Sequence, residues 1–330
     1  MRICAECFKA EDWKEHIRAY GERGQCDCCG QKEVVSIEVT DFEPFFSEMM
    51  RIYTQADDGK PLYFLIQRDF EIARDEECVK LVLKSIFPDT YEKNYEYAPS
   101  VLSIIQKWIQ LKDKIKYEFR YFSGSDIESS KLDYVFECNE VVSKGSLYYR
   151  GRLNDREDYN YHTPSELGMP PKDLTPNGRA NPHGIPCLYL TSLPETTMYE
   201  LRSVYGDKIS IASFKAIEPL KVLDFDKKPW IYEAYEDERL LEVIRAYLLK
   251  KRIGEELSKP MRRYDFKDLE YVSTQFVCEY IKKNGADGIL YSSAAHQGGK
   301  NLVLFSDSKV KFVGVSVKIV DKSTMRFVAS

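Results

Sequence analysis

The sequence lacks long hydrophobic runs, a basic excess and internal repeats. No apolar stretch approaches the ~20 residues that a membrane-spanning helix needs, so no membrane span is expected. The formal net charge is −5, whereas nucleic-acid-binding chains usually carry a basic excess, so charge argues against a general nucleic-acid partner. Hydrophobic residues make up 43% of the 330 residues and charged residues 31%. This composition predicts a globular chain of two or three domains.

Four of the nine cysteines form two Cys-x-x-Cys pairs, Cys4 with Cys7 and Cys26 with Cys29. The two thiolates of such a pair converge on one metal at about 2.3 Å, and two pairs close a tetrahedral site. Gly30 directly follows the second pair and suits the tight turn that such a knuckle needs. The spacing therefore predicts a structural Zn²⁺ bound by these four cysteines.

The alternative for these cysteines is a set of buried or disulfide-bonded thiols. No stretch typical of a signal peptide precedes them, because Arg2 and Glu6 interrupt the apolar residues, so a reducing cytoplasmic location is expected. Zinc therefore remains the favoured interpretation. Cys28 is left over as a spare thiol, although it could replace Cys26 as a ligand.

Composition and periodicity predict three regions and an α+β fold class. Residues 1–39 are expected to form a zinc ribbon, residues 40–140 a mainly helical domain, and residues 141–330 a mixed α/β catalytic domain. The ribbon should contain a helix over residues 12–20 and a strand at 34–39, and the middle region helices at 75–87 and 101–117. For the last region, strands are expected at 187–190, 209–214, 220–225, 288–291, 302–305 and 310–317, and helices at 194–204, 233–250 and 270–284.

Three patches in the last region, residues 148–152, 167–202 and 287–305, carry an unusual set of side chains. They offer arginines, an aromatic residue in a strand, a carboxylate on a helix and a serine in a strand-to-loop turn. Arginine forks bind pyrophosphate, an aromatic face can stack a pyridinium ring, and a carboxylate can stabilise an oxocarbenium ion. Each residue alone has a more ordinary explanation as an ion pair, a core residue or a turn residue. Spacing alone does not identify the substrate.

These patches resemble the RES domain, a family named for its arginine, glutamate and serine. The matching pieces are Tyr149-Arg150, Gly-Arg-Ala-Asn-Pro at 178–182, Gly-Ile-Pro-x-Leu-Tyr-Leu at 184–190, Thr-x-x-x-Glu at 196–200, Asp-Gly-Ile-x-Tyr-x-Ser at 287–293 and Gly-x-Asn-Leu-Val-Leu-Phe at 299–305. The first 140 residues, with their cysteine pairs, resemble the HEPN/RES N-terminal domain that often precedes it.

The resemblance implies an ADP-ribosyltransferase-like fold that binds NAD⁺ and breaks its nicotinamide–ribose bond. Family members are typically toxins of bacterial toxin–antitoxin pairs, so a separately encoded antitoxin is an implied partner. Carried over by position, the family residues are Arg150, Glu200 and Ser293 as the catalytic set, with Arg150, Arg179, Tyr189 and Asn301 contacting NAD⁺. Water or phosphate would then be the acceptor. The alternatives are transfer of ADP-ribose to a protein, or a non-catalytic zinc-ribbon binding module.

For two pairs of nearby residues, the sequence leaves open which member faces the pocket. Ser292 stands where the family usually has proline, so either Ser292 or Ser293 could face the pocket. Neighbouring side chains of a strand point to opposite faces, and the alternation with Tyr291 favours Ser293. Arg150 and Arg152 lie on the same side of an extended segment, so either could supply the family arginine.

Overall fold

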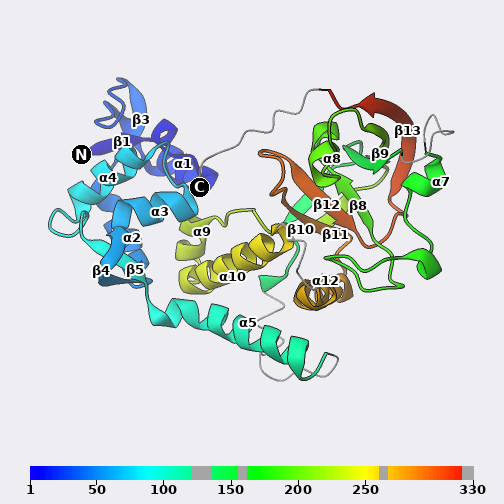
Figure 1. Cartoon of the computed structure of the whole chain (residues 1–330). Helices are drawn as coiled ribbons and strands as arrows, with labels where there is room; N and C mark the ends of the chain where they lie inside the picture. Colours follow the sequence, from blue (N-terminus) through cyan, green and yellow to red (C-terminus); the bar gives the residue numbers. More distant parts are fainter. Residues whose placement is uncertain (121–134, 155–161, 260–266, 322–330) are drawn as a thin grey trace. The chain divides into compact units, whose positions relative to one another are not determined.

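The computed structural model describes residues 1–120, 135–154, 162–259 and 267–321 (Figure 1). The chain divides into two compact units, Met1–Lys107 with Lys228–Leu249, and Trp108–Lys227 with Lys250–Ser330. Each unit is assembled from two separate stretches of chain. The expected division in chain order, at residues 39 and 140, stays a prediction.

The beginning of the first unit is a small three-stranded antiparallel sheet with one helix. Its strands are β1 (Arg2–Cys4), β2 (Glu22–Gly24) and β3 (Val34–Glu38), in the order β1-β3-β2. A 3₁₀ turn at Ala5–Cys7 leads to α1 (Glu11–Tyr20). Trp13 and Ile17 of α1 are fully buried, which is the amphipathic face expected from the sequence. The helix expected at 12–20 and the strand expected at 34–39 are confirmed within one residue.

The rest of the first unit is mainly helical. Its helices are α2 (Glu43–Met50), which follows a 3₁₀ turn at Val39–Phe42, then α3 (Leu62–Phe70), α4 (Glu76–Ile86) and α9 (Ile231–Glu236). A two-stranded antiparallel sheet, β4 (Tyr53–Pro61) with β5 (Asn94–Tyr97), accompanies them. The long helices α5 (Pro99–Tyr117) and α10 (Leu240–Ser258) contribute residues to both units.

An aromatic cluster forms the core of the first unit. The Trp13 ring lies 4.8 Å from the Phe42 and Phe45 rings and 4.9 Å from the Tyr232 ring, measured between centroids. The carboxylate of the buried Asp12 also accepts the Tyr232 backbone N–H at 2.9 Å. These contacts explain why α9, remote in sequence, belongs to the first unit.

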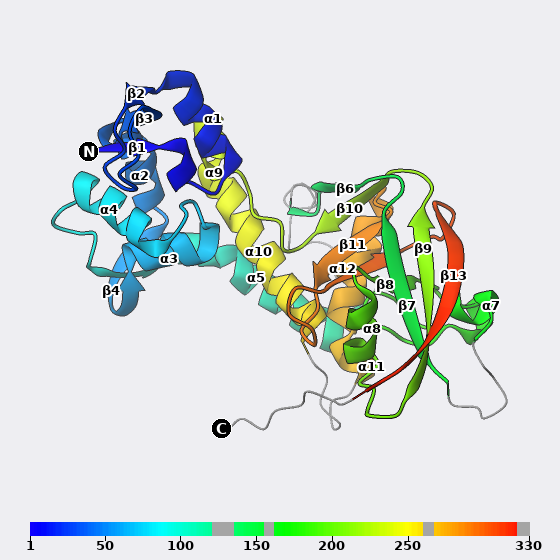
Figure 2. The ribbon, with the colours of Figure 1, turned by 90° about the horizontal axis from the view of Figure 1, so that it is seen from above.

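The second unit contains an eight-stranded mixed sheet in the order β13-β9-β7-β8-β12-β11-β10-β6, part of which Figure 2 shows with β7, β9 and β13 side by side. The pair β10–β11 is parallel and the other neighbours are antiparallel. The bounds are β6 Glu140–Val142, β7 Leu147–Leu153, β8 Leu188–Thr191, β9 Lys208–Ala216, β10 Leu220–Asp224, β11 Gly288–Ser292, β12 Lys300–Leu304 and β13 Val310–Ile319. All six strands expected in this region are confirmed.

Helices and apolar side chains cover the two faces of this sheet. The helices are α7 (Pro164–Leu167), α8 (Pro194–Glu200), α11 (Lys267–Glu270) and α12 (Val272–Lys283), with a 3₁₀ turn at Lys172–Leu174. One apolar cluster includes Leu190, Leu290 and Leu302, and another joins Ile211 to Met198 of α8. Among the described residues, no helix has the length and apolarity to cross a membrane.

Gly151 of β7 allows α8 to pack closely against the sheet. A Cβ added at Gly151 would lie 2.8 Å from Cβ of Thr197 and 2.9 Å from Cδ1 of Leu201, distances that real Cβ atoms do not tolerate. Glycine at this strand position therefore lets the helix that ends at Glu200 approach the backbone of β7.

Candidate functional site

A cavity of about 220 Å³ opens in the second unit where β7, β8, β12, β11 and α8 meet. The strand register explains this convergence, because Asn301 pairs with Thr191 on one side and with Tyr291 on the other. Directly paired residues share a face of the sheet, so these three side chains form one row. The side chains that matter for the chemistry of the cavity are Arg150, Tyr189, Thr197, Glu200, Tyr291 and Asn301.

Glu200 is the last residue of α8, and two side chains hold its carboxylate. Its Oε1 accepts the hydroxyl of Ser293 at 2.6 Å and the amide Nδ2 of Asn301 at 2.8 Å. Ser293 and Asn301 are both buried, with 8% of each residue exposed. The carboxylate is therefore fixed from two directions through one oxygen, and Oε2 receives no hydrogen bond from the described residues.

The Ser293 hydroxyl has its own direction fixed by the loop that follows β11. Its Oγ accepts the backbone N–H groups of Ala295 at 3.2 Å and His296 at 3.1 Å. The hydroxyl proton is then directed to Glu200. Ser292 instead donates to Oδ2 of Asp226 at 2.9 Å. Of the two adjacent serines, Ser293 is therefore the one that hydrogen-bonds Glu200. Its hydroxyl donates to the carboxylate, so that proton is not free to bind a ligand in the cavity.

Arg150 of β7 is one of the residues that line the cavity. Its Nη1 donates to the carbonyl of Gly168 at 2.6 Å, and the side chain forms no ion pair with any described residue. Burial lowers the Arg150 pKa, and the nearby positive charge of Arg152 lowers it further. Arg152 itself is exposed and contacts the Glu166 carbonyl at 3.4 Å. Arg150 is therefore the arginine of this pair that lines the cavity, and its guanidinium has donors left for an anion.

Tyr189 of β8 lines the same cavity. Its hydroxyl donates to Oδ1 of Asn181 at 2.6 Å and accepts the backbone N–H of Ala180 at 3.1 Å. Burial raises the Tyr189 pKa well above its usual range, so the phenol stays neutral. A Cβ at Gly178 would lie 2.5 Å from this hydroxyl. The segment 178–182 therefore holds the Tyr189 side chain in place.

Arg179 does not reach the cavity that Arg150 lines. It donates to the carbonyls of Glu256 at 3.4 Å and Lys259, and its guanidinium lies 5.5 Å from the centre of the Tyr271 ring. These residues line a different cavity of the second unit, of about 650 Å³. The structure thus separates the two arginines that the resemblance assigns to NAD⁺.

Tyr291 lines the Arg150 cavity and was not among the site residues expected from the sequence. Burial raises its pKa, the charge of Arg179 opposes this rise, and the carboxylate of Glu200 adds to it. The signal was present in the alternation of β11, which puts Tyr291 on the same face as Ser293. Tyr291 is therefore within electrostatic range of both Arg179 and Glu200.

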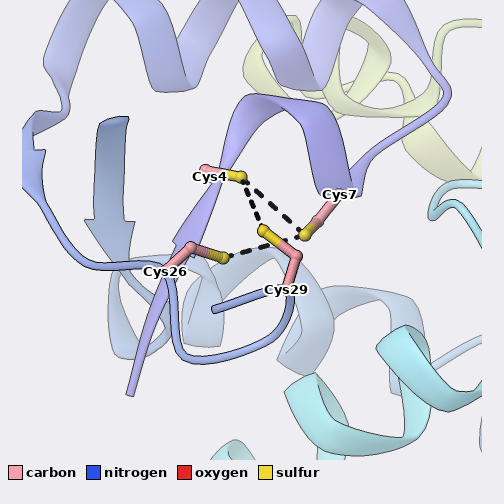
Figure 3. Close-up of side chains that lie close together, drawn as sticks. All are labelled: Cys4, Cys7, Cys26 and Cys29. Carbon is pink, nitrogen blue, oxygen red and sulfur yellow. Dashed lines mark hydrogen bonds between the residues drawn. The ribbon is translucent and has the colours of Figure 1, made fainter. Parts of the chain in front are cut away.

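The two cysteine pairs of the first unit come together as one cluster (Figure 3). The sulfur–sulfur distances are 3.8 Å for Cys4–Cys7, 3.7 Å for Cys4–Cys29 and 3.7 Å for Cys7–Cys26. A tetrahedron of thiolates about 2.3 Å from a central zinc has edges of about 3.8 Å. The four sulfurs therefore fit a structural zinc, and Gly30 at φ +75° makes the expected turn.

Cys28 lies outside this quartet. Its sulfur is 3.1 Å from that of Cys78, a residue of α4, and the quartet contains Cys26. The alternative in which Cys28 replaces Cys26 is thus not the arrangement that the structure adopts.

Comparison with known proteins gives one family and one solved structure. The sequence profile of the RES domain matches residues 149–328. The crystal structure of the M. tuberculosis MbcT-MbcA toxin–antitoxin complex contains a chain with 14% identity and a TM-score of 0.34, and the match covers 58% of this chain and 91% of that one. No curated protein matches.

Proposed function

The chain belongs to the RES domain family, and from this premise we propose that its second unit is an NAD⁺-consuming toxin that cleaves the nicotinamide–ribose bond. The observation that carries this proposal is one cavity that combines Arg150, a cation with no ion-pair partner among the described residues, with Glu200, a carboxylate held by Ser293 and Asn301. A cation and a fixed carboxylate suit a ligand that pairs an anionic phosphate with a developing positive charge.

Arg150 would bind a phosphate oxygen of NAD⁺. Its guanidinium uses one N–H on the Gly168 carbonyl, which fixes the direction of the remaining donors. A guanidinium hydrogen-bonds phosphate in a planar, often bidentate geometry, and burial strengthens the attraction by excluding water. The lowered pKa of Arg150 reflects the cost of keeping this charge without a carboxylate partner, and a bound phosphate would offset that cost.

Glu200 would act at the bond that breaks. Loss of nicotinamide leaves positive charge on the ribose ring, and a carboxylate held in place stabilises that charge without reorganising during the reaction. The hydrogen bonds from Ser293 and Asn301 hold Oε1, which leaves Oε2 for the ribose. In this mechanism Ser293 and Asn301 are positioning residues. No step requires a metal in the second unit.

The size of the cavity favours the reacting end of NAD⁺ as its occupant. At about 220 Å³ it is smaller than the ~300–1,000 Å³ of pockets that enclose drug-sized ligands. It would therefore take nicotinamide and its ribose, with the Tyr189 ring beside the pyridinium. The roles of Arg179 in binding phosphate and of Asn301 in direct contact with NAD⁺ stay predictions.

For the first unit we propose a structural zinc bound by Cys4, Cys7, Cys26 and Cys29. The sulfur spacing of about 3.7–3.8 Å and the burial of three of the four residues support a closed site without an open position for substrate. The zinc would tie the strand β1 to the knuckle after β2. The likeness of the first 140 residues to a HEPN/RES N-terminal domain, and a separately encoded antitoxin as partner, belong to the same proposal.

The test is to incubate the purified protein with NAD⁺, with and without inorganic phosphate, and to identify the products by mass. Free nicotinamide with ADP-ribose indicates water as the acceptor, and a phosphorylated ADP-ribose formed only with phosphate indicates a phosphorylase. ADP-ribose attached to an added protein fraction would instead support the transferase alternative. Intact NAD⁺ in every arm, with folded and zinc-loaded protein, would refute the proposed activity.

A further inference from the structure

A second pair of cysteines lies beside the proposed zinc quartet without belonging to it. The sulfur of Cys28, in the knuckle after β2, is 3.1 Å from the sulfur of Cys78 in the first turn of α4. Cys78 also donates its S–H to the carbonyl of Cys7 at 3.6 Å. These two thiols are 50 positions apart in the chain and lie together only because the first unit folds.

The geometry separates this pair from a second metal site. Cys7, Cys28 and Cys78 lie within 4.8 Å of one another, so a shared metal is the obvious alternative. However, the quartet has edges of 3.7–3.8 Å, which suit two ligands of one zinc, whereas Cys28 and Cys78 are 3.1 Å apart. Cys7 already belongs to the quartet. The pair is thus closer than zinc ligands and needs only a small movement to bond.

We propose that Cys28 and Cys78 form a reversible disulfide, with a peroxide as the oxidant. Cys28 is half-exposed and Cys78 is buried, so Cys28 is the sulfur that a small oxidant can reach. The Cys28 sulfur attacks one peroxide oxygen and the O–O bond breaks. Water is released, and Cys28 becomes a sulfenic acid. The Cys78 sulfur then attacks the Cys28 sulfur, the S–S bond forms, and a second water carries away the hydroxyl and the proton.

The position of Cys78 suits a resolving thiol. Its backbone N–H is bound by the side chain of Asp75, the N-cap of α4, at 2.9 Å, so the first turn of the helix holds the sulfur in place. The disulfide would join the cysteine knuckle to α4 and close the chain from residue 28 to residue 78. Closing such a loop restricts the unfolded chain and so stabilises the first unit. This proposal does not depend on the NAD⁺ activity.

The test begins with reduced protein whose metal content has been measured. After treatment with hydrogen peroxide, the intact mass should be ~2 Da lower through loss of two hydrogens, and subsequent alkylation should add two fewer alkyl groups than it adds to the reduced protein. A non-reducing tryptic digest should then link peptide 24–32 to peptide 75–80. Dithiothreitol should reverse the link, and the metal content should be unchanged.

Variants locate the bond within peptide 24–32, which also contains Cys26 and Cys29. Cys28→Ser and Cys78→Ser should each abolish the link, whereas Cys138→Ser, which removes a half-exposed thiol of the second unit, should leave it intact. The urea midpoint of the first unit should rise on oxidation in the unaltered protein and in Cys138→Ser, and should not rise in Cys28→Ser or Cys78→Ser. A link through Cys26 or Cys29, or two zinc ions per chain with Cys28 and Cys78 both protected from alkylation, would overturn the proposal.

Discussion

Ser293 donates its hydroxyl proton to Oε1 of Glu200 over 2.6 Å, across 93 positions of sequence. The same hydroxyl oxygen accepts two backbone N–H groups, so the serine joins the loop after β11 to the end of α8. Its part in the proposed reaction is to orient a carboxylate. Ser292, one residue earlier, donates its hydroxyl proton to the carboxylate of Asp226 instead.

Ser293→Ala should therefore impair NAD⁺ cleavage, and Ser292→Ala should be near neutral. Losing a hydrogen bond to a charged group costs on the order of 1–3 kcal/mol, which corresponds to roughly ten- to hundredfold in rate. Because Ser293 acts through Glu200, the loss should appear mainly in kcat and little in KM. Steady-state kinetics of the two variants decide the point, and a crippled Ser292→Ala beside an active Ser293→Ala would contradict the proposed register.

Arg150→Ala should weaken NAD⁺ binding, and Arg152→Ala should have little effect. Arg150 lines the cavity and has no ion-pair partner in the described part of the chain, whereas Arg152 is exposed and does not line it. A lost hydrogen bond to a charged group costs about 1.5–3 kcal/mol, so Kd should rise ~10- to 100-fold. Titration calorimetry in a Glu200→Gln background would measure binding without turnover. Equal losses in both arginine variants would point to a diffuse charge effect instead.

The sequence predicted local structure well where turn residues and alternation were clear. The strand expected at 288–291 is β11, and its alternation placed Ser293 on the face of Tyr291. The contact of Ser293 with Glu200 was not predictable, because strand alternation predicts on which face of the sheet a side chain lies but not which residue it contacts. The likeness to the RES family supplied that pairing of residue types.

Two features of the first unit, strand β4 and the packing of helix α9, could not be predicted from the sequence, and each has a physical reason. Strand β4 contains Asp57, Asp58 and Gly59, residues of low strand propensity, and it exists through its pairing with β5. Helix α9 belongs to the core of Trp13 although Tyr232 lies 220 positions from Asp12. The sequence alone groups that helix with its neighbours in the chain, because contacts between residues far apart in the sequence leave no pattern in the local sequence.

Cys29→Ser should remove the metal from the first unit and leave the second unit folded. Purified protein is expected to carry about one zinc per chain from the ligand count, and loss of one thiolate opens the tetrahedron. Metal analysis with native-state proteolysis should show zinc loss and faster cleavage within residues 1–107. Cys138→Ser is the matched control and should retain the zinc. Freshly purified reduced protein without any metal would remove the zinc hypothesis.

Glu200→Gln is the sharpest test of the reaction itself. The change keeps the size of the side chain and its carbonyl oxygen, which can still accept hydrogen bonds from Ser293 and Asn301, so folding should be unaffected. It removes the negative charge that would stabilise the ribose cation, and such preorganised electrostatic groups contribute on the order of 10²- to 10³-fold in kcat. Substrate binding through Arg150 should persist.

The matched control for this change is Glu195→Gln, which alters an exposed carboxylate at the other end of α8. NAD⁺ consumption by this variant should equal that of the unaltered protein, because Glu195 does not line the cavity. Nicotinamide release, followed by mass or by chromatography, compares the three proteins at saturating NAD⁺. Full turnover in Glu200→Gln, together with weaker binding in Arg150→Ala, would mean that the cavity binds the dinucleotide but that another group stabilises the ribose cation. Tyr291, which pairs directly with Asn301 in the sheet, would then be the next residue to change.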